Sequence, residues 1–308
     1  MIAAIVELEP LGPEGFPRLP EGHAELEPLL TAFTDARDRD LRGRDRRFLV
    51  ESPRVVPRFL RSEFACEAVL TTPAGLAAIE PMLAGRPDRT TVFLVEEVAI
   101  DRLSGYRFHG GMLALGVRPF RPPPAAAASA EIGPGPATLL AAEGVVRVDN
   151  VGALFRNAAC LGARGVLLDH ACADPLLRKA IRFSTGRVFD LPWGVTRDEP
   201  DALARELRRL RDEQGFRIVA AETGPRAKPL GPGPKPERVV LVVGAETSGL
   251  SAATLDACDE VVAIPMAEGD ADDPRSLNVA AASAIMLYAH AVAGSRPAAA
   301  SPARRSDA

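Results

Sequence analysis

Short runs of consecutive apolar residues alternate with amphipathic stretches through the second half of the chain, and each run ends in a polar or glycine-rich turn. Apolar runs of this kind are typical of parallel strands that are buried on both faces. The pattern predicts strands at 138–142, 165–169, 188–192, 216–221, 239–243 and 261–264, and helices at 150–161, 175–183, 200–213 and from 276 onward. This alternation predicts an α/β domain with a mainly parallel sheet that is covered by helices.

A shorter alternation precedes it and predicts a small α/β layer. Strands are expected at 48–50, 68–71, 91–95 and 111–117, with helices at 55–64, 75–83 and 96–103. Proline, glycine and alanine are concentrated outside these two regions, which indicates loose segments. The expected division is a loose lead-in at 1–30, a small domain at 31–120, a linker at 121–137, the larger domain at 138–293 and a disordered tail at 294–308.

Composition narrows the class of protein. The 308 residues are 47% hydrophobic, so a sizeable core is expected. The apolar runs are too short to span a bilayer and no basic segment precedes the apolar patch at the N-terminus, so we expect a cytoplasmic protein with no membrane partner. The four cysteines form no C-x-x-C pair and the histidines do not cluster with them, so we expect neither a metal site nor a disulfide framework.

The charge is unevenly distributed along the chain. A formal net charge of −4 argues against a nucleic-acid partner. Between Arg37 and Arg61, however, nine arginines stand against four acidic residues, and a second basic group lies at 178–187. A solvated face and a phosphate-binding surface both explain such groups.

The turn at 244–249 follows an apolar run and has the G-x-x-x-x-G spacing of a phosphate loop. Leu250 and Ser251 come next, where a Walker A motif has lysine and then serine or threonine, so an NTPase is excluded. No G-x-G-x-x-G follows a strand, so the dinucleotide fingerprint is absent too. A nucleotide-like ligand held by backbone groups stays open. Glu246 is also explained as an acid near the start of the next helix, where the helix dipole favours it.

The start of the helix predicted at 150–161 combines a polar cap with a glycine. Asn150 or Asp149 is expected to cap this helix, which leaves Gly152 in the first turn. Glycine costs about 1 kcal/mol there relative to alanine, so we expect close approach of another backbone or of a ligand. Arg156 emerges among apolar neighbours; a surface arginine whose stem covers the core is the alternative explanation.

The last helix begins in a similar way. Ser276 is expected to be its N-cap, which does not explain why Asn278, a mediocre helix former, occupies the first turn. Small side chains at 280–284 indicate that another element packs closely on this helix.

Together, these three stretches resemble the motifs of the SpoU/TrmH family of RNA 2′-O-ribose methyltransferases, within the SPOUT class. The first motif is similar to Asn150-x-Gly152-x-x-x-Arg156, and the second to the segment from Leu241 to Ser251. The third resembles Ile264-Pro265-Met266 followed by Ser276-Leu277-Asn278-Val279. The resemblance covers 138–293. A looser resemblance relates 47–119 to the family's small RNA-binding domain, which is similar in fold to ribosomal protein L30e.

The resemblance implies a mainly parallel α/β domain with a deep trefoil knot, a homodimer packed through its helices, and S-adenosylmethionine as cofactor without a metal. It implies cofactor contacts from Gly244, Ala245, Ile264, Met266 and Leu277. It implies a catalytic group of Arg156, Asn150, Glu246, Ser276 and Asn278, in which Arg156 activates the ribose 2′-hydroxyl or positions its phosphate. Two features depart from the usual pattern: the long acidic loop at 267–275, and Ser184-Thr185-Gly186-Arg187 in place of Ser-x-Gly-Ala.

The function that the resemblance predicts is methylation of a ribose 2′-hydroxyl in RNA. Ribosomal RNA is favoured over tRNA because of the accessory N-terminal domain. A tRNA 2′-O-methyltransferase and a catalytically inactive RNA-binding relative stay open as alternatives, and the missing glycine fingerprint disfavours an enzyme for another adenosine-containing ligand. Phosphate contacts are then expected from Arg44, Arg46, Arg47, Arg178, Lys179, Arg182 and Arg187.

Overall fold

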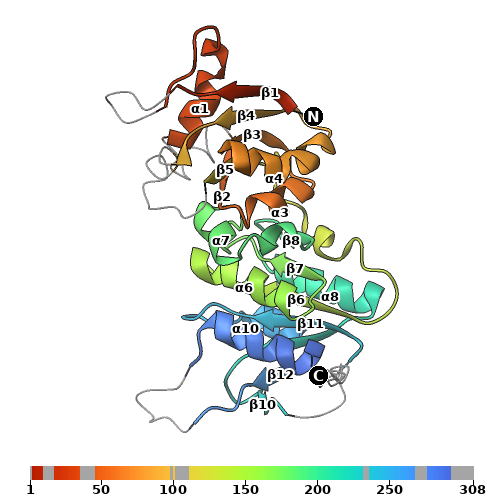
Figure 1. Ribbon diagram of the computed structural model, residues 1–308. Helices are drawn as coiled ribbons and strands as arrows, with labels where there is room; N and C mark the ends of the chain where they lie inside the picture. Colours follow the sequence, from red (N-terminus) through yellow and green to blue (C-terminus); the bar gives the residue numbers. More distant parts are fainter. Residues whose placement is uncertain are drawn as a thin grey trace, which may run out of the picture.

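The computed structural model describes residues 2–9, 17–34, 46–97, 100, 111–231, 236–267 and 276–292. Two sheets follow one another along an elongated molecule, with β1 (Ile2–Glu7) at one end and β10 (Lys228–Pro229) at the other (Figure 1). None of the helices in the described part of the chain has the length and hydropathy that crossing a bilayer requires.

The N-terminal sheet has five strands in the order β1-β4-β3-β5-β2. Its other members are β2 (Arg47–Glu51), β3 (Cys66–Thr71), β4 (Thr90–Leu94) and β5 (Met112–Val117). β5 runs antiparallel to β2 and β3, and the remaining pairs are parallel. Apolar residues of α1 (Glu27–Thr34), which follows the short η1 (Ala24–Leu26), pack on one face, while those of α3 (Val56–Arg61) and α4 (Pro73–Ala84) pack on the other.

The expected loose lead-in is wrong for two parts of the N-terminus. Residues 2–7 form the edge strand β1, parallel to β4, and residues 24–34 form η1 and α1. Val6 on β1 is buried, so even a short strand contributes to the core once a neighbouring strand satisfies its backbone. Most of the helix expected at 96–103 lies outside the described residues.

The C-terminal sheet has seven strands in the order β10-β12-β9-β11-β6-β7-β8, and every recorded pair is parallel. This confirms the predicted mainly parallel sheet. The strands not yet bounded are β6 (Ala137–Ala142), β7 (Gly165–Leu168), β8 (Trp193–Val195), β9 (Arg217–Ala221), β11 (Arg238–Val243) and β12 (Glu260–Ala263). β10 was not predicted, because it lies inside a loop rich in proline and glycine.

Helices cover both faces of this sheet. Buried residues of α6 (Val148–Cys160), α7 (Arg178–Phe183) and α10 (Val279–Leu287) share one core with one face. Buried residues of α8 (Ala202–Gln214) and α9 (Ala252–Ala257) share a second core with the other face. Short helical segments lie before and after these elements in the chain. η3 (Ala125–Ser129) interrupts the linker, and η5 (Tyr288–Val292) continues α10 as a π-helix.

The strand predicted at 188–192 is wrong. That segment begins with the short helix η4 (Arg187–Phe189), and the strand β8 starts only after Pro192. Gly186 precedes η4 in a left-handed conformation with φ of 76°, which turns the chain. Phe189 then packs against Phe48 and Phe59 of the N-terminal domain, at centroid distances of 6.0 and 5.3 Å. An apolar run therefore serves the contact between the domains instead of extending a strand.

Aromatic rings continue this contact between the two domains. Phe64 stacks on Trp193 at 6.4 Å and meets Phe189 at 5.8 Å. Residues of both domains consequently belong to one hydrophobic core. Ion pairs add to it: Arg118 binds Asp174 at 2.7 Å, and Arg178 pairs with the buried Glu51.

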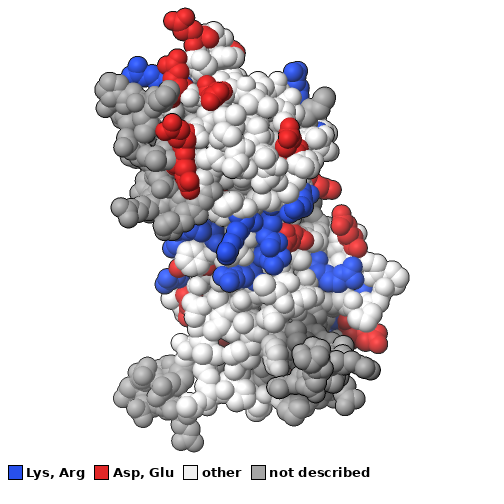
Figure 2. Space-filling model, viewed as in Figure 1, with Lys and Arg blue, Asp and Glu red and all other residues white. Residues whose placement is uncertain are grey.

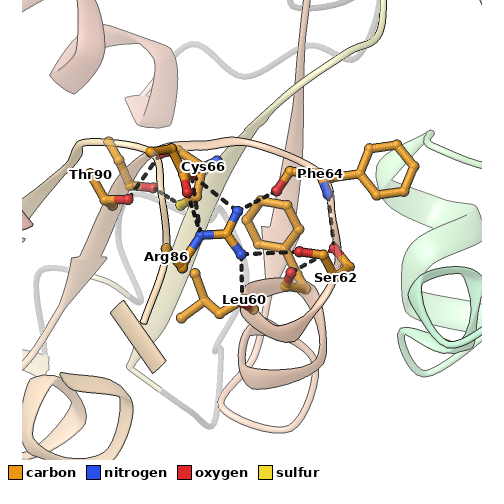
Figure 3. A network of polar contacts seen from close by, with 9 residues as sticks. Leu60, Ser62, Phe64, Cys66, Arg86 and Thr90 are labelled. Carbon is orange, nitrogen blue, oxygen red and sulfur yellow. Dashed lines mark hydrogen bonds and ion pairs between the residues drawn. The ribbon is translucent and has the colours of Figure 1, made fainter. Parts of the chain in front are cut away.

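The loop that presents Phe64 is held by the buried Arg86 (Figure 3). Its guanidinium donates to the carbonyl oxygens of Leu60, Ser62 and Phe64 at 2.5 to 3.2 Å. Asp88 pairs with Arg86 at 2.9 Å and accepts the Cys66 amide at 2.6 Å. One arginine thus satisfies a carbonyl in the last turn of α3 and two carbonyls of the loop that follows it.

Candidate active site

A cavity of about 430 Å³ lies at the carboxyl ends of β9, β11 and β12. Its walls come from the residues after each strand and from the start of α10. All five residues expected to contact a cofactor line it, together with two of the expected catalytic residues: Gly244, Ala245, Ile264, Met266, Leu277, Glu246 and Ser276. Parallel strands bring these loops to one edge of the sheet, which is where α/β domains bind ligands.

The turn after β11 has no room for a side chain at its first position. A Cβ on Gly244 would lie 2.5 Å from the carbonyl carbon of Gly249 and 2.8 Å from the amide nitrogen of Leu250. The amide of Gly249 donates to the Ala245 carbonyl at 2.9 Å and closes the turn. Gly249 itself has a φ of 64°, which favours glycine. At Gly244 the turn therefore leaves only backbone beside the cavity.

Glu222 is a cavity residue that no sequence motif indicated. It follows β9, and its Oε2 accepts the Leu250 amide at 2.9 Å. A carboxylate thereby fixes the turn of the neighbouring strand. Its position directly after a predicted parallel strand was the available signal, because such residues gather at the ligand edge of the sheet.

One asparagine connects the three motifs. Asn278 is the N-cap of α10, and its Oδ1 accepts the Ala280 amide at 2.9 Å. Its Nδ2 donates to Asn150 Oδ1 at 3.1 Å and also to Glu246 Oε1. The first turn of α6, the turn after β11 and the start of α10 therefore meet at a single amide group beside the cavity.

Three local expectations at this site are wrong. Ser276 does not cap the last helix, since Asn278 takes that position. Neither Asn150 nor Asp149 caps α6, which starts at Val148 after Arg147 and has no side-chain cap. The side chain of Asn150 is consequently free to bond Asn278 across the sheet edge.

Glu246 does not lie at the start of a helix either. α9 begins at Ala252, where Ser251 is the N-cap and accepts the Thr254 amide at 3.2 Å. Glu143 in turn accepts hydrogen bonds from the amide and hydroxyl of Ser251, at 2.9 and 2.7 Å. The helix-dipole explanation for Glu246 is therefore replaced by its contact with Asn278.

The close approach expected at Gly152 is confirmed. A Cβ there would lie 2.6 Å from the Ala180 carbonyl oxygen and 2.7 Å from Phe183 Cβ, so the glycine lets α6 and α7 pack backbone to backbone. Asn157, on the same helix, donates to the Ala280 carbonyl at 2.7 Å and to Ser283 Oγ at 3.0 Å. These contacts fix α6 between α7 and α10.

Arg156 is exposed on α6. Among the residues that the structure describes, no hydrogen bond or ion pair joins it to Asn150, Glu246, Ser276 or Asn278. The structure thus brings Asn150, Glu246 and Asn278 together and leaves Arg156 outside that cluster. Ser276 lines the cavity without a recorded bond to the cluster.

Electrostatics at the mouth of the site is dominated by one exposed pair. Arg147 donates to Asp149 at 3.2 Å, and this hydrogen bond lowers the pKa of the Asp149 carboxyl below its usual value. The same hydrogen bond, with the nearby charges of Asp149 and Glu246, raises the pKa of Arg147. Glu246 therefore faces a permanent positive charge.

The two basic groups of the sequence meet in the middle of the molecule, where Lys and Arg side chains gather around the junction of the two domains (Figure 2). Arg58 and Arg187 share Asp190 at 2.7 Å each, and Lys179 lies 3.5 Å from Asp149. Arg47 pairs with Glu67, Arg46 lies over Phe120, and Arg182 is exposed. Arg44 lies outside the described residues. Phosphate binding by these side chains stays a prediction.

A mainly parallel α/β domain with a cavity at the carboxyl edge of its sheet is typical of α/β proteins that bind nucleotide-type ligands. Comparison with known proteins is more specific. Residues 137–288 match the model of the SpoU rRNA Methylase family. An uncharacterized tRNA/rRNA methyltransferase of Mycobacterium tuberculosis is 35% identical over 265 residues, which cover 81% of this chain and 85% of that protein.

Solved structures agree in fold. An AdoMet-bound rRNA methyltransferase from Sinorhizobium meliloti superposes with a TM-score of 0.66 at 19% identity, covering 92% of this chain and 97% of that one. An RNA 2′-O ribose methyltransferase superposes with a TM-score of 0.58 at 26% identity, covering 92% and 97%. The chain belongs to the SpoU/TrmH family of RNA methyltransferases.

Proposed function

We propose that the protein transfers the methyl group of S-adenosylmethionine to the 2′-hydroxyl of a ribose in RNA. The observation that carries this proposal is the meeting of Asn150, Glu246 and Asn278 beside the cavity at the carboxyl edge of the sheet. The family supports RNA as the substrate, and the relative whose printed name specifies 2′-O ribose methylation supports the position of the methyl group.

The cavity fits an S-adenosylmethionine molecule in character. Apolar walls from Ile264, Met266 and Leu277 suit the adenosine, and the glycine turn at 244–249 lets main-chain groups approach a ligand closely. When bound, the cofactor supplies a methyl group already activated by its sulfonium. Glu222 provides a carboxylate at the wall, where it can accept hydrogen bonds from ligand hydroxyls.

The chain's own residues then have to align a weakly nucleophilic hydroxyl and help its proton to leave. Asn278 holds the Glu246 carboxylate beside the cavity, and Asn150 fixes the orientation of the Asn278 amide. Arg156, always protonated, is suited to position the ribose phosphate rather than to abstract a proton. Ser276 contributes a hydroxyl at the wall.

We further propose a homodimer that packs through α10. Leu277, Ile285 and Tyr288 are 39, 39 and 60% exposed on or beside this helix, an apolar face that a second copy would cover. The deep trefoil knot and the L30e-like nature of the N-terminal domain belong to the same proposal. Ribosomal RNA is the favoured substrate because a whole additional domain packs beside the methyltransferase domain.

Three measurements test the proposal. Calorimetry in the presence of a chelator is expected to detect S-adenosylmethionine binding, and radiolabelled cofactor is expected to label bulk ribosomal RNA more than tRNA. Alkaline hydrolysis then locates the label, because a 2′-O-methyl group blocks cleavage of the adjacent phosphodiester. Label in bases instead of riboses contradicts the 2′-O assignment. Cofactor binding without transfer to any RNA favours the inactive relative.

A further inference from the structure

A second cavity, of about 640 Å³, opens at the junction of the two domains and shares no residue with the first. Its floor and walls include Trp193 and Val195 of β8 and the loop after β7. The rim comes from Arg46 and from the segment 118–122, which leads out of the N-terminal domain. Neither domain alone encloses this space.

The rim carries an exposed aromatic ring under a cation. Phe120 is 80% exposed, and the Arg46 guanidinium lies 4.6 Å from its ring centroid. Val146, 69% exposed, adds apolar surface to the same cavity. Exposed rings beside arginines are the platforms on which proteins stack the bases of single-stranded nucleic acids.

The backbone of Arg46 is held in an uncommon conformation that places it at this rim. Its φ is 52°, in the left-handed region that non-glycine residues rarely adopt. The Arg118 amide donates to the Arg46 carbonyl at 2.7 Å, and one Arg46 nitrogen donates to the Arg118 carbonyl at 3.2 Å. Backbone strain of this kind concentrates at ligand sites.

The carboxylates in the cavity wall are already bonded to the protein. Asp169 accepts the amides of Gly144 and Cys172 at 2.9 and 3.1 Å. Asp174 pairs with Arg118 at 2.7 Å and accepts the Leu176 amide at 2.8 Å. Their charge is therefore offset locally, and the cation at the rim remains Arg46, which suits an anionic ligand.

The cavity is close to the candidate active site. Only β6 separates β7 from β11 in the sheet, so the loops after these two strands are roughly 10 Å apart. Val148 lines the junction cavity, and Asn150, two residues later on α6, bonds Asn278. A ligand in the junction cavity is thus within reach of a neighbour of the nucleotide being methylated.

We propose that the junction cavity binds a nucleobase of single-stranded RNA next to the methylated nucleotide, stacked on Phe120, with the adjoining phosphate on Arg46. This inference rests on the proposed function for its orientation relative to the methylated ribose. The two domains then read the substrate together, because the cavity exists only between them.

Trp193 is the only tryptophan of the chain and lines this cavity, so its fluorescence reports on an occupant. The experiment titrates a ten-residue oligouridylate into protein saturated with S-adenosylhomocysteine, which blocks the first cavity. Wild type is expected to show quenching, and Phe120→Ala to weaken binding about 5- to 100-fold. Phe120→Tyr, which retains an aromatic ring, is expected to bind the oligouridylate about as tightly as wild type. Ile5→Ala, which trims an exposed residue on the distant β1, is the matched control and binds like wild type.

Salt dependence separates stacking from phosphate binding. Phe120→Ala removes no charge and is expected to keep the wild-type slope of log Kd against log salt, whereas Arg46→Ala lowers that slope by about one contact. Ribose 5-phosphate is expected to compete poorly with uridine 5′-monophosphate. Equal competition by both, or Phe120→Ala binding within twofold of wild type, overturns the inference.

Failure of the junction cavity to bind RNA can be distinguished from failure of the proposed function. Phe120→Ala is expected to bind S-adenosylmethionine like wild type in calorimetry, because Phe120 does not line the first cavity. If no cofactor binds to wild type, the proposed function fails, while Phe120-dependent quenching by RNA still supports the junction cavity. If cofactor binds and methyl transfer occurs but quenching is absent, only the junction cavity is overturned.

Discussion

Asn278 performs two tasks with the two ends of one amide. Its oxygen caps α10, and its nitrogen bonds Asn150 and Glu246. The residue type satisfies both tasks, because an amide is at once acceptor and double donor. The motif grouped Asn278 with Asn150 and Glu246, and the structure joins these three side chains, whereas the cap was expected at Ser276, where the helix was predicted to begin.

Replacing Asn278 separates these tasks. Asn278→Ser keeps a capping oxygen but is too short to reach Glu246 and Asn150, so we expect unfolding free energy within about 0.5 kcal/mol of wild type. We expect methyl transfer to fall roughly 100-fold, since misplacing a reacting group by 1 Å has that effect. Single-turnover assays and urea denaturation check this. Asn278→Ala is the control: besides losing methyl transfer, it is expected to lose about 1 kcal/mol of unfolding free energy, because the helix cap is removed. A serine variant with full activity contradicts the orienting role of Asn278.

Gly244 offers a test of the backbone-lined turn. Gly244→Ala places a Cβ against the backbone of Gly249 and Leu250, which cannot move away as a side chain would. We expect cofactor affinity to fall at least tenfold and stability to fall by about 1–3 kcal/mol. Gly133→Ala is the matched control, because nothing lies within 4 Å of its would-be Cβ. Calorimetry on both variants provides the comparison, and an alanine at 244 that binds like wild type refutes the steric argument.

At the level of elements, strands were predicted more accurately than the starts of helices. β6, β9, β11 and β12 fall within about a residue of the predicted runs, because burial on both faces leaves an unbroken apolar signal. α6 starts two residues before its expected cap, since its first turn is fixed by packing on α7 and α10. The strand predicted at 188–192 is wrong for a related reason, because Phe189 in this apolar run packs on the N-terminal domain.

The loop before β3 depends on the Arg86–Asp88 pair. Burial alone would raise the pKa of Asp88, but the hydrogen bonds from Arg86 and the Cys66 amide lower it below its usual value. A depressed pKa stabilises the fold above the unfolded value of about 3.9, and this stabilisation is lost as pH falls through the folded pKa.

Asp88→Asn is therefore expected to destabilise the protein at pH 7 by about 1.5–3 kcal/mol, the range for a hydrogen bond to a charged group. Below about pH 4 the difference from wild type is expected to shrink, because wild type then loses the same carboxylate. Urea denaturation at pH 7, 5 and 3.5 measures this difference in unfolding free energy between the variant and wild type. Asp212→Asn, on the exposed part of α8, serves as control. A difference that grows in acid contradicts the assignment.

For the whole molecule, the contact between domains decides the arrangement, and local periodicity carried no signal for it. Phe48 and Phe64 belong to a strand and a helix predicted for the small domain, yet they pack on Phe189 and Trp193 of the other domain. Likewise, Arg178 was singled out as a phosphate ligand, and the structure pairs it with Glu51 of β2. Partners more than a hundred residues apart are chosen by tertiary packing, which a single sequence does not display.

Breaking that ion pair tests whether the domains unfold as one. Glu51→Gln removes the buried carboxylate that faces the partly buried Arg178, so we expect a loss of about 3–5 kcal/mol and a separation of the unfolding transition into two steps. The double variant Glu51→Leu/Arg178→Met, which removes both charges, is expected to recover most of it. Calorimetric scans resolve the transitions. Equal losses in the single and double variants rule out a role for the pair.

The contacts of Asn278 with Asn150 and Glu246 also have a consequence for the order in which the sheet and the site are completed during synthesis. The three residues of this cluster lie at positions 150, 246 and 278, so a growing polypeptide that has reached β12 already contains Asn150 and Glu246 but not the amide that joins them. Domains fold as they emerge during synthesis. All seven strands of the C-terminal sheet are therefore synthesised before the residue that completes the site, so a nascent chain acquires the cluster only after Asn278 has been added.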